Sequence, residues 1–170
     1  MSNRWPVLAC VIASCIIWAF HVNQPALHAQ QRTPSGLIAL YDFGDASGPI
    51  VKDRSGVGEA VDLRIGDMRA VRRAEGSLEV RGKTAIRSGK PAKKIIEAIK
   101  RSNQITIETW LRPANNKQEG PARIVTLSRN PNERNFTLGQ ERDQYDFRLR
   151  TTRTSTNGIP SLATPRRSLT

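Results

Sequence analysis

Histidine and cysteine are almost missing from this sequence of 170 residues, which contains two of each. All four of them (Cys10, Cys15, His21 and His28) lie within the first 29 residues. A chain without them cannot form a disulfide, hold zinc or haem through imidazole and thiolate ligands, or use a catalytic triad that contains histidine. If the first 29 residues are removed, all of these classes are excluded for the rest of the chain.

A hydrophobic run long enough to span a membrane is also missing. The longest run, residues 7–20, has fourteen residues, whereas a helix needs roughly 20 residues to cross a bilayer. The run follows Arg4 and leads through a polar stretch to Leu27-His28-Ala29, which is the layout of a signal peptide. We therefore expect residues 1–29 to be a signal peptide cleaved after Ala29. The mature chain would be extracytoplasmic (periplasmic, at the cell surface or secreted), with no stable membrane span.

A second way of processing this leader stays open. The segment Ile12-Ala13-Ser14-Cys15 has the pattern of a bacterial lipobox, which would lead to a lipoprotein. The apolar run continues past Cys15 through Ile16, Ile17 and Trp18, and this favours the signal peptide.

Acidic residues are scarce relative to basic ones, with 15 against 27 and a formal net charge of +12, to which the leader contributes only Arg4. Such a chain attracts anionic partners, which outside the cytoplasm means acidic polysaccharide, another surface polymer or a membrane surface more often than nucleic acid. The basic residues form pairs such as Arg72-Arg73 and Lys93-Lys94 and never a run of five or six. This dispersion favours a soluble surface with excess charge.

Alternation of apolar and polar residues dominates the remaining sequence and predicts short strands. A polar leader (residues 30–35) precedes the first strand, at 36–43, and a turn-rich segment with at most one brief strand at 49–51 follows it. Further strands are predicted at 61–65, 78–81, 104–112, 123–128, 135–139 and 145–151. The clearest is 104–112, which places Ile105, Ile107 and Leu111 on one side and is stopped by Pro113.

One segment has helical spacing instead: residues 91–101, with Ile95, Ile96 and Ile99 on one face and Asn103 near its end. Residues 152–170 are rich in Thr, Ser, Gly and Pro and are expected to form a loop or disordered tail. Short, closely spaced strands with one helix predict an all-β antiparallel sandwich over residues 36–151.

Three motifs together resemble the laminin-G-like family with the concanavalin A-type jelly roll, as found in secreted bacterial proteins. They are Gly36-Leu37-Ile38-Ala39-Leu40-Tyr41-Asp42-Phe43, Val51-Lys52-Asp53-Arg54-Ser55-Gly56 and Ile105-Thr106-Ile107-Glu108-Thr109-Trp110-Leu111-Arg112-Pro113. The resemblance implies a jelly-roll sandwich. The later strands of the family pattern have no counterpart here, so we expect an incomplete jelly roll, whether from a fragment, a truncated gene model or a shortened homologue.

Calcium is a possible ligand that the resemblance implies, because related modules often bind it through loop carboxylates. Asp42 and Asp53 are the candidate ligands, although turn chemistry alone explains aspartate at such places. No stretch has the spacing of an EF-hand loop, and we expect no other cofactor.

Trp110 and three arginines are the candidate ligand-binding residues. Trp110 lies opposite the apolar side of its predicted strand and could stack on a sugar ring, but the resemblance favours a structural role. Arg148 and Arg150 share the face opposite Phe147 and, with Arg153, make the densest basic stripe on a predicted strand. A plain polar outer face is the alternative.

Catalysis is the remotest option. Some enzymes with this jelly roll use paired carboxylates on one strand, and the nearest match here is Glu141-Arg142-Asp143-Gln144-Tyr145-Asp146, which lacks the final glutamate and straddles a predicted turn. We therefore expect a non-catalytic, exported recognition module that binds carbohydrate or another surface polymer, or contacts a protein. The alternative is a structural or protein-interaction domain of a larger exported polypeptide.

Overall fold

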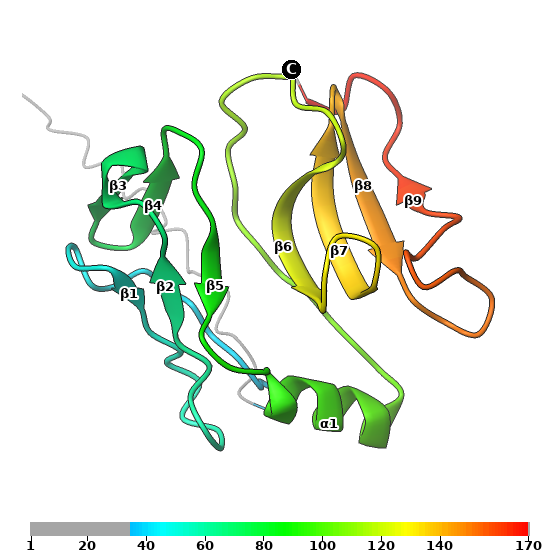
Figure 1. Ribbon diagram of the computed structural model, residues 1–170, viewed down its shortest axis with the longest axis horizontal. Coiled ribbons are helices and arrows are strands. Elements are labelled where there is room, and N and C mark those ends of the chain that lie inside the picture. The colour runs from blue at the N-terminus through cyan, green and yellow to red at the C-terminus, as the bar shows by residue number, and fades with distance from the viewer. Residues whose placement is uncertain (1–34, 170) are drawn as a thin grey trace, which may run out of the picture. The chain divides into compact units, whose positions relative to one another are not determined.

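The structure is mostly β, with antiparallel sheets and one short helix (Figure 1). It is a computed structural model that describes residues 35–169, so the expected signal peptide and nearly all of the polar leader lie outside the described residues. The elements are β1 (Ile50–Val51), β2 (Leu63–Ile65), the 3-10 helix η1 (Met68–Ala70), β3 (Val71–Ala74), β4 (Ser77–Val80), β5 (Ile86–Ser88), α1 (Lys93–Ser102), β6 (Ala122–Ser128), β7 (Arg134–Glu141), β8 (Gln144–Leu149) and β9 (Leu162–Ala163).

Three sheets arise from these strands, and every pairing in them is antiparallel. The first has the order β1-β2-β5, the second is the β3-β4 hairpin, and the third has the order β6-β7-β8-β9. Residues 37–170 form one compact unit. The predicted all-β, antiparallel character with one short helix is therefore confirmed.

The four-stranded sheet has one apolar face, which its register defines. Residues that are directly opposite on neighbouring strands point to the same face, and Phe136 pairs with both Leu127 and Leu149. The same face carries Val125, Leu138 and Phe147. Phe136 is buried. The apolar face arises from the alternation of apolar and polar residues in the strands predicted at 123–128, 135–139 and 145–151.

The N-terminal part contains three of the buried hydrophobic residues. Val51, Val61 and Ile65 are 1%, 5% and 3% exposed, and they come from β1, β2 and the residues just before β2. The turn-rich segment around Ile50 does form one brief strand, as expected. Such short strands make few backbone hydrogen bonds with one another. Side-chain contacts therefore contribute more to the stability of this part.

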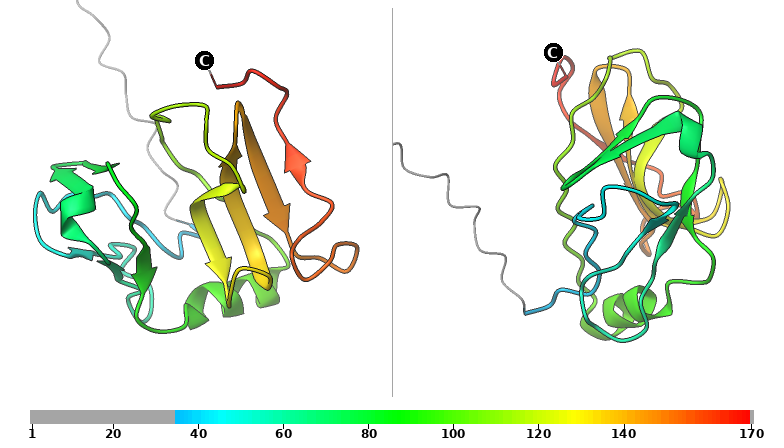
Figure 2. Two further views of the ribbon diagram at one scale, coloured as in Figure 1. Left: turned by 45° about the horizontal axis from the view of Figure 1, so that its top comes forward. Right: turned by 90° about the vertical axis from the view of Figure 1, so that its left-hand side faces the viewer.

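Helix α1 agrees with its prediction. Its isoleucines are half-buried, and Asn103 ends it in the left-handed conformation (φ 53°), with its N–H donating to the Ile99 carbonyl. Asparagine tolerates this conformation better than most residues. Figures 1 and 2 show α1 at one end of the four-stranded sheet, where Ile96 and Ile99 border a cavity of about 130 Å³ with Phe136 and Leu149.

Two predicted strands are wrong. Residues 36–43 and 104–112 belong to no sheet, although Ile105, Ile107 and Leu111 are half-buried while their neighbours are exposed. In residues 104–112 alternation therefore predicted the half-buried isoleucines and Leu111, although Thr109 on the same side is exposed. Pairing also needs a neighbouring strand, which the sequence pattern cannot supply.

The structure also corrects the predicted burial of Val80 and adds three strands that were not predicted. Val80, expected to be buried on its strand, is 52% exposed. Strands β3 and β5 were not predicted, and residues 152–170, expected to be a loop or tail, contain β9, which pairs with β8.

Candidate functional site

The hairpin of β7 and β8 is the base on which the candidate site is built. Six residue pairs connect the two strands, from Phe136 opposite Leu149 to Glu141 opposite Gln144. Arg142, in the left-handed conformation (φ 53°), and Asp143 form a tight turn. This turn confirms the hairpin expected around residues 140–144, and it places polar side chains where two loops can attach.

The first loop attached to the hairpin is residues 113–120. The Gln140 side-chain amide donates to the Asn115 carbonyl (2.6 Å) and the Arg142 carbonyl (2.9 Å). The Arg142 N–H donates to the Gln118 carbonyl (2.7 Å), and the Glu141 carboxylate accepts the Gly120 N–H (2.9 Å). Gln140 is buried, so the loop is fixed by a side chain that water does not compete for.

The second attached segment is the end of the described chain, residues 164–169. Thr164 exchanges hydrogen bonds with Tyr145, because its hydroxyl accepts the Tyr145 N–H (3.0 Å) and its own N–H donates to the Tyr145 carbonyl (3.0 Å). The Asp143 carboxylate accepts the Arg167 N–H (2.8 Å), and the Asp143 carbonyl accepts the Leu169 N–H (3.2 Å). One hairpin thus positions two segments about 50 residues apart.

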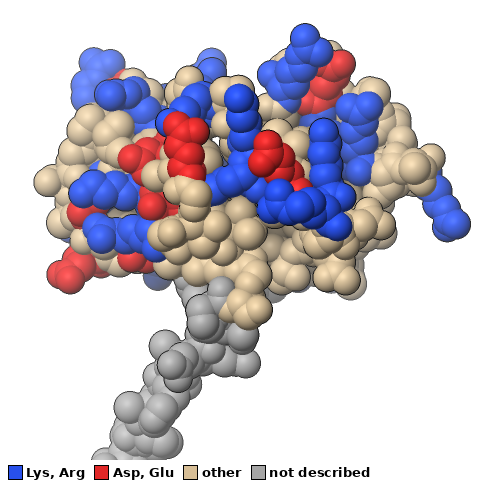
Figure 3. All heavy atoms as spheres, turned by 90° about the horizontal axis from the view of Figure 1, so that it is seen from below, with Lys and Arg blue, Asp and Glu red and all other residues tan. Residues whose placement is uncertain are grey.

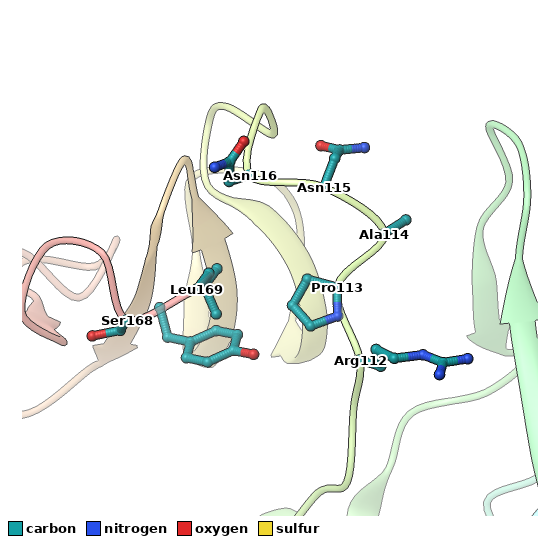
Figure 4. A pocket seen from close by; sticks show the side chains of 8 residues that line it. Arg112, Pro113, Ala114, Asn115, Asn116, Ser168 and Leu169 are labelled. Carbon is teal, nitrogen blue, oxygen red and sulfur yellow. The ribbon is translucent and has the colours of Figure 1, made fainter.

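Between these two segments lies a cavity of about 420 Å³, which we call the hairpin cavity. Figure 4 shows residues 112–116 along one side, with Ser168 and Leu169 arriving from the other. The Arg112 guanidinium points away from Leu169. The lining residues are Arg112, Pro113, Ala114, Asn115, Asn116, Tyr145, Ser168 and Leu169.

The chemistry of the hairpin cavity is mixed. Tyr145 contributes a half-buried phenol, and Pro113 and Leu169 contribute half-buried apolar surface. Asn115 and Asn116 contribute exposed side-chain amides, which donate and accept hydrogen bonds. An aromatic ring with a few amides and hydroxyls suits a polar ligand that has one apolar face.

Trp110, a candidate sugar platform, lies outside the residues that line the hairpin cavity. Its side of the segment faces solvent, and the residue is 71% exposed. The prediction that Trp110 faces opposite to Ile105, Ile107 and Leu111 therefore agrees with the burial pattern.

The predicted basic stripe does not form as a continuous exposed row. Arg148 has a side chain only 17% exposed and donates to the buried Asp146 carboxylate (2.8 Å), so its charge is compensated. Arg150 and Arg153 are exposed. The buried Arg134 lies near Arg148, and burial, with the charges of Arg148 and Arg123, lowers the pKa of the Arg134 guanidinium.

Basic side chains are instead dispersed. On the face seen in Figure 3 they occur at many separate places and are interspersed with acidic ones. The expectation of scattered positive charge fits this view, which suggests weak attraction to polyanions over a broad area.

Asp53, a candidate calcium ligand, is the centre of a hydrogen-bond cluster. Its carboxylate accepts the N–H groups of Leu40 (3.2 Å), Ser55 (3.1 Å) and Val61 (3.1 Å) and forms an ion pair with Lys94 on α1. The Asp53 side chain is fully buried. Burial on its own raises the pKa of Asp53, but the hydrogen bonds from Lys94, Val61 and Ser55 outweigh it, and the pKa lies well below its ordinary value.

Neighbouring groups complete this Asp53 cluster. The Asp62 carboxylate accepts the Asp53 N–H (2.9 Å), and the Tyr41 hydroxyl donates to the Val61 carbonyl (2.7 Å). Burial, with the charges of Asp53 and Asp62, raises the pKa of Tyr41. Because N–H groups and an ammonium surround the Asp53 oxygens, calcium would have to displace hydrogen bonds that hold the fold.

Asp42, the other candidate calcium ligand, lies in an exposed ion-pair group. Its carboxylate contacts the Arg54 guanidinium (3.2 Å) and accepts the Gly44 N–H (3.0 Å), while Arg54 also contacts Asp45 (2.9 Å). Across residues 35–169, no three His, Cys, Asp or Glu side chains are grouped closely enough to hold a metal ion. Asp42 and Asp53 are not brought together around a common site.

The carboxylates of the enzyme-like motif have separate roles. Glu141 holds the Gly120 N–H, Asp143 holds the Arg167 N–H, and the buried Asp146 pairs with Arg148. Residues 142–143 form the turn, as the sequence indicated. These contacts account for all three carboxylates as parts of the hairpin and its attachments.

Sequence reasoning missed most of the hairpin cavity. Tyr145, Asn115 and Asn116 were not candidate site residues, and residues 168–169 were expected to belong to a tail. A usable signal was the polar stretch 140–144 between two strands, because side chains beside a tight turn can hold neighbouring loops.

Comparisons with known proteins add no relative: no protein-family model, curated protein or solved structure matches the chain. Within the part of the chain that the structure describes, no helix is both long and apolar enough to cross a membrane. The functional argument therefore depends on the hairpin cavity and on the chemistry of the sequence.

Proposed function

We propose that the chain is an exported, non-catalytic recognition module that binds carbohydrate in the hairpin cavity. The observation that carries the proposal is a hollow of about 420 Å³ that Tyr145, Asn115 and Asn116 all line. This volume lies in the range of small-molecule sites, roughly 300–1,000 Å³. A pyranose ring has an apolar face for stacking on an aromatic ring and hydroxyls that pair with amides.

The charge of the chain favours an anionic polymer over a neutral one. With a formal net charge of +12, scattered lysines and arginines attract a polyanion without forming a specific site. The cavity would then recognise one or two sugar residues, while the surface charge raises the local concentration of the polymer. Binding of this kind needs no cofactor.

The proposed setting is outside the cytoplasm, with residues 1–29 removed as a signal peptide. The proposed fold is an incomplete concanavalin A-type jelly roll, for which the antiparallel sheets and the three family-like motifs give support. The alternative function, a protein-interaction domain of a larger exported polypeptide, is favoured by one observation, the exposure of the large apolar residues Val80, Ile159 and Leu162.

Binding to insoluble polysaccharides tests the proposal. The chain is mixed with an acidic gel, such as polygalacturonate, and with cellulose, at low and at physiological ionic strength. We expect binding to the acidic polymer that weakens with salt but persists. Tyr145→Ala should weaken the residual binding roughly two- to tenfold, which is what the loss of one aromatic contact costs.

Trp110→Ala is the matched control, because it removes an exposed aromatic residue outside the hairpin cavity. It should bind like the wild type. Equal weakening by both variants, or binding that salt abolishes completely, would contradict the proposed site, and a blank result on every polymer would contradict the function.

A further inference from the structure

The smaller cavity beside α1, which we call the helix cavity, is separate from the hairpin cavity. Its volume is about 130 Å³, and no residue lines both cavities. It is bordered by α1, by the beginning of β7 and the end of β8, and by the segment that follows α1. The lining residues are Ile96, Ile99, Lys100, Ile105, Asn135, Phe136, Leu149 and Arg150.

Five of the lining residues are apolar, and they come from three parts of the chain. Ile96 and Ile99 lie about one turn apart on α1, Ile105 follows the helix, and Phe136 is directly opposite Leu149 in the β7–β8 ladder. Phe136 is buried and the other four are half-buried. Apolar side chains around an unfilled space lack packing contacts on one side. An apolar group of matching size would supply these contacts.

The volume limits the size of such a group. A cavity of roughly 150 Å³ lined by leucine, isoleucine and phenylalanine holds one benzene molecule. The helix cavity has the same kinds of side chain and about 130 Å³. It therefore suits one aromatic ring or a short alkyl chain, and it is too small to enclose a disaccharide.

The opening of the helix cavity is polar and positively charged. Lys100, Asn135 and Arg150 line the cavity and are themselves exposed, which places them where it meets solvent. Lys100 comes four residues after Ile96, so α1 brings an ammonium and part of the apolar wall to the same side. The Arg150 N–H donates to the Asn135 carbonyl (2.8 Å), which keeps these two residues side by side.

The two cations at this opening have no counter-charge. Within residues 35–169, the side chains of Lys100 and Arg150 form no hydrogen bond or ion pair. None of the residues that line the helix cavity is acidic. An anionic group at the opening would therefore meet two available cations and no repelling carboxylate from the lining.

We propose that the helix cavity binds a small carboxylate whose body is one aromatic ring or a short alkyl chain. The body fills the apolar part, and the carboxylate stays at the opening beside Lys100. A carboxylate in this position keeps part of its hydration, which avoids the cost of burying a charge. A neutral ring compound gains only the apolar contacts, and an anion without an apolar body gains only the charge. The site goes beyond the proposed polysaccharide binding and does not depend on it.

Methyl NMR of the chain during a titration with benzoate tests the proposal. We expect saturable shifts of the Ile96, Ile99 and Ile105 methyl signals, whereas Ile65, in β2, should not shift. Benzyl alcohol, which has the ring without the charge, should shift the same methyl signals but bind about two- to fivefold more weakly, as expected for the loss of an exposed ion pair. Acetate should leave these signals unchanged.

Lys100→Gln keeps the length of the side chain and removes its charge. It should weaken benzoate binding about two- to fivefold and leave benzyl alcohol binding unchanged. The matched control is Lys93→Gln, the same substitution at an exposed position of α1 that does not line the cavity, and it should bind benzoate like the wild type.

Three results would overturn the proposal: no shift of the three isoleucine signals with benzoate, equal affinity for benzoate and benzyl alcohol, or equal weakening by the two lysine variants. Tyr145 lines only the hairpin cavity, so Tyr145→Ala should bind benzoate like the wild type. Failure of polysaccharide binding and failure of benzoate binding are therefore distinguishable.

Discussion

The N-terminal part, residues 37–103, and the C-terminal part, residues 114–169, are both β-rich but are held together differently. In the C-terminal part, β6, β7 and β8 have six to eight residues each, and each neighbouring pair is joined by six residue pairs. In the N-terminal part the strands have two to four residues, and the buried Asp53 carboxylate joins residue 40, the loop 55–61 and α1. The long strands are held by the many backbone hydrogen bonds between them. The short strands depend in addition on the buried Asp53 carboxylate, which we call the polar centre.

Removing the charge at the polar centre should have the largest effect. Asp53→Asn leaves the Lys94 ammonium, whose side chain is only 11% exposed, without a counter-charge. Breaking a buried pair in this way costs about 3–5 kcal/mol, so the free energy of unfolding should fall by this amount in a urea titration.

The matched control for this change is Glu59→Gln, which breaks the exposed ion pair between Glu59 and Lys90. It should leave the urea midpoint almost unchanged. Equal losses from the two variants would show that Asp53 is no more important than a surface carboxylate.

A smaller loss is expected from Gly158→Ala in the C-terminal part. Gly158 has a left-handed backbone (φ 72°), and an added Cβ would lie 2.9 Å from the Leu149 backbone nitrogen, against β8. The left-handed conformation alone costs roughly 1–2 kcal/mol for a residue with a side chain, and the clash adds to this.

Gly76→Ala isolates the contribution of the clash. Gly76 has nearly the same backbone (φ 74°), but an added Cβ would meet nothing within 4 Å. In thermal unfolding, the melting temperature of Gly158→Ala should be lower than that of Gly76→Ala, and both should be lower than that of the wild type. The reverse order would mean that residues near 158 do not pack against β8 as described.

How far the sequence predicts the fold differs between the same two parts. Strands β6 to β8 and helix α1 were predicted from local periodicity, because each is long enough for its side-chain pattern to repeat. Strands β3, β5 and β9 were missed, whereas β1, β2 and β4, which are equally short, were predicted. Shortness alone therefore does not decide the outcome, because the pairing of a short strand is set by partners elsewhere in the chain. Residues 104–112 show the converse, because a clear pattern does not supply a partner.

The candidate site was harder to predict than the fold. Asp53 stood out in a family-like motif, but the sequence could not reveal that α1 delivers Lys94 to it from 41 residues away. Asn115 and Leu169 line one cavity only because Gln140 and Asp143 attach their segments to one hairpin. Such contacts depend on the folded topology and leave no local signature.

The free energy of unfolding, measured as the pH falls from neutral into the acid range, tests the role of Asp53 most directly. Its pKa in the folded chain lies below the ordinary value of 3.8, so its contribution is complete well above pH 3.8 and is lost as the pH falls below that value and the unfolded chain takes up the proton. The unfolding free energies of the wild type and Asp53→Asn, measured by urea titration from neutral pH downward, should differ by a constant amount until about pH 5 and then converge. Two curves that stay parallel to the lowest pH would contradict the account.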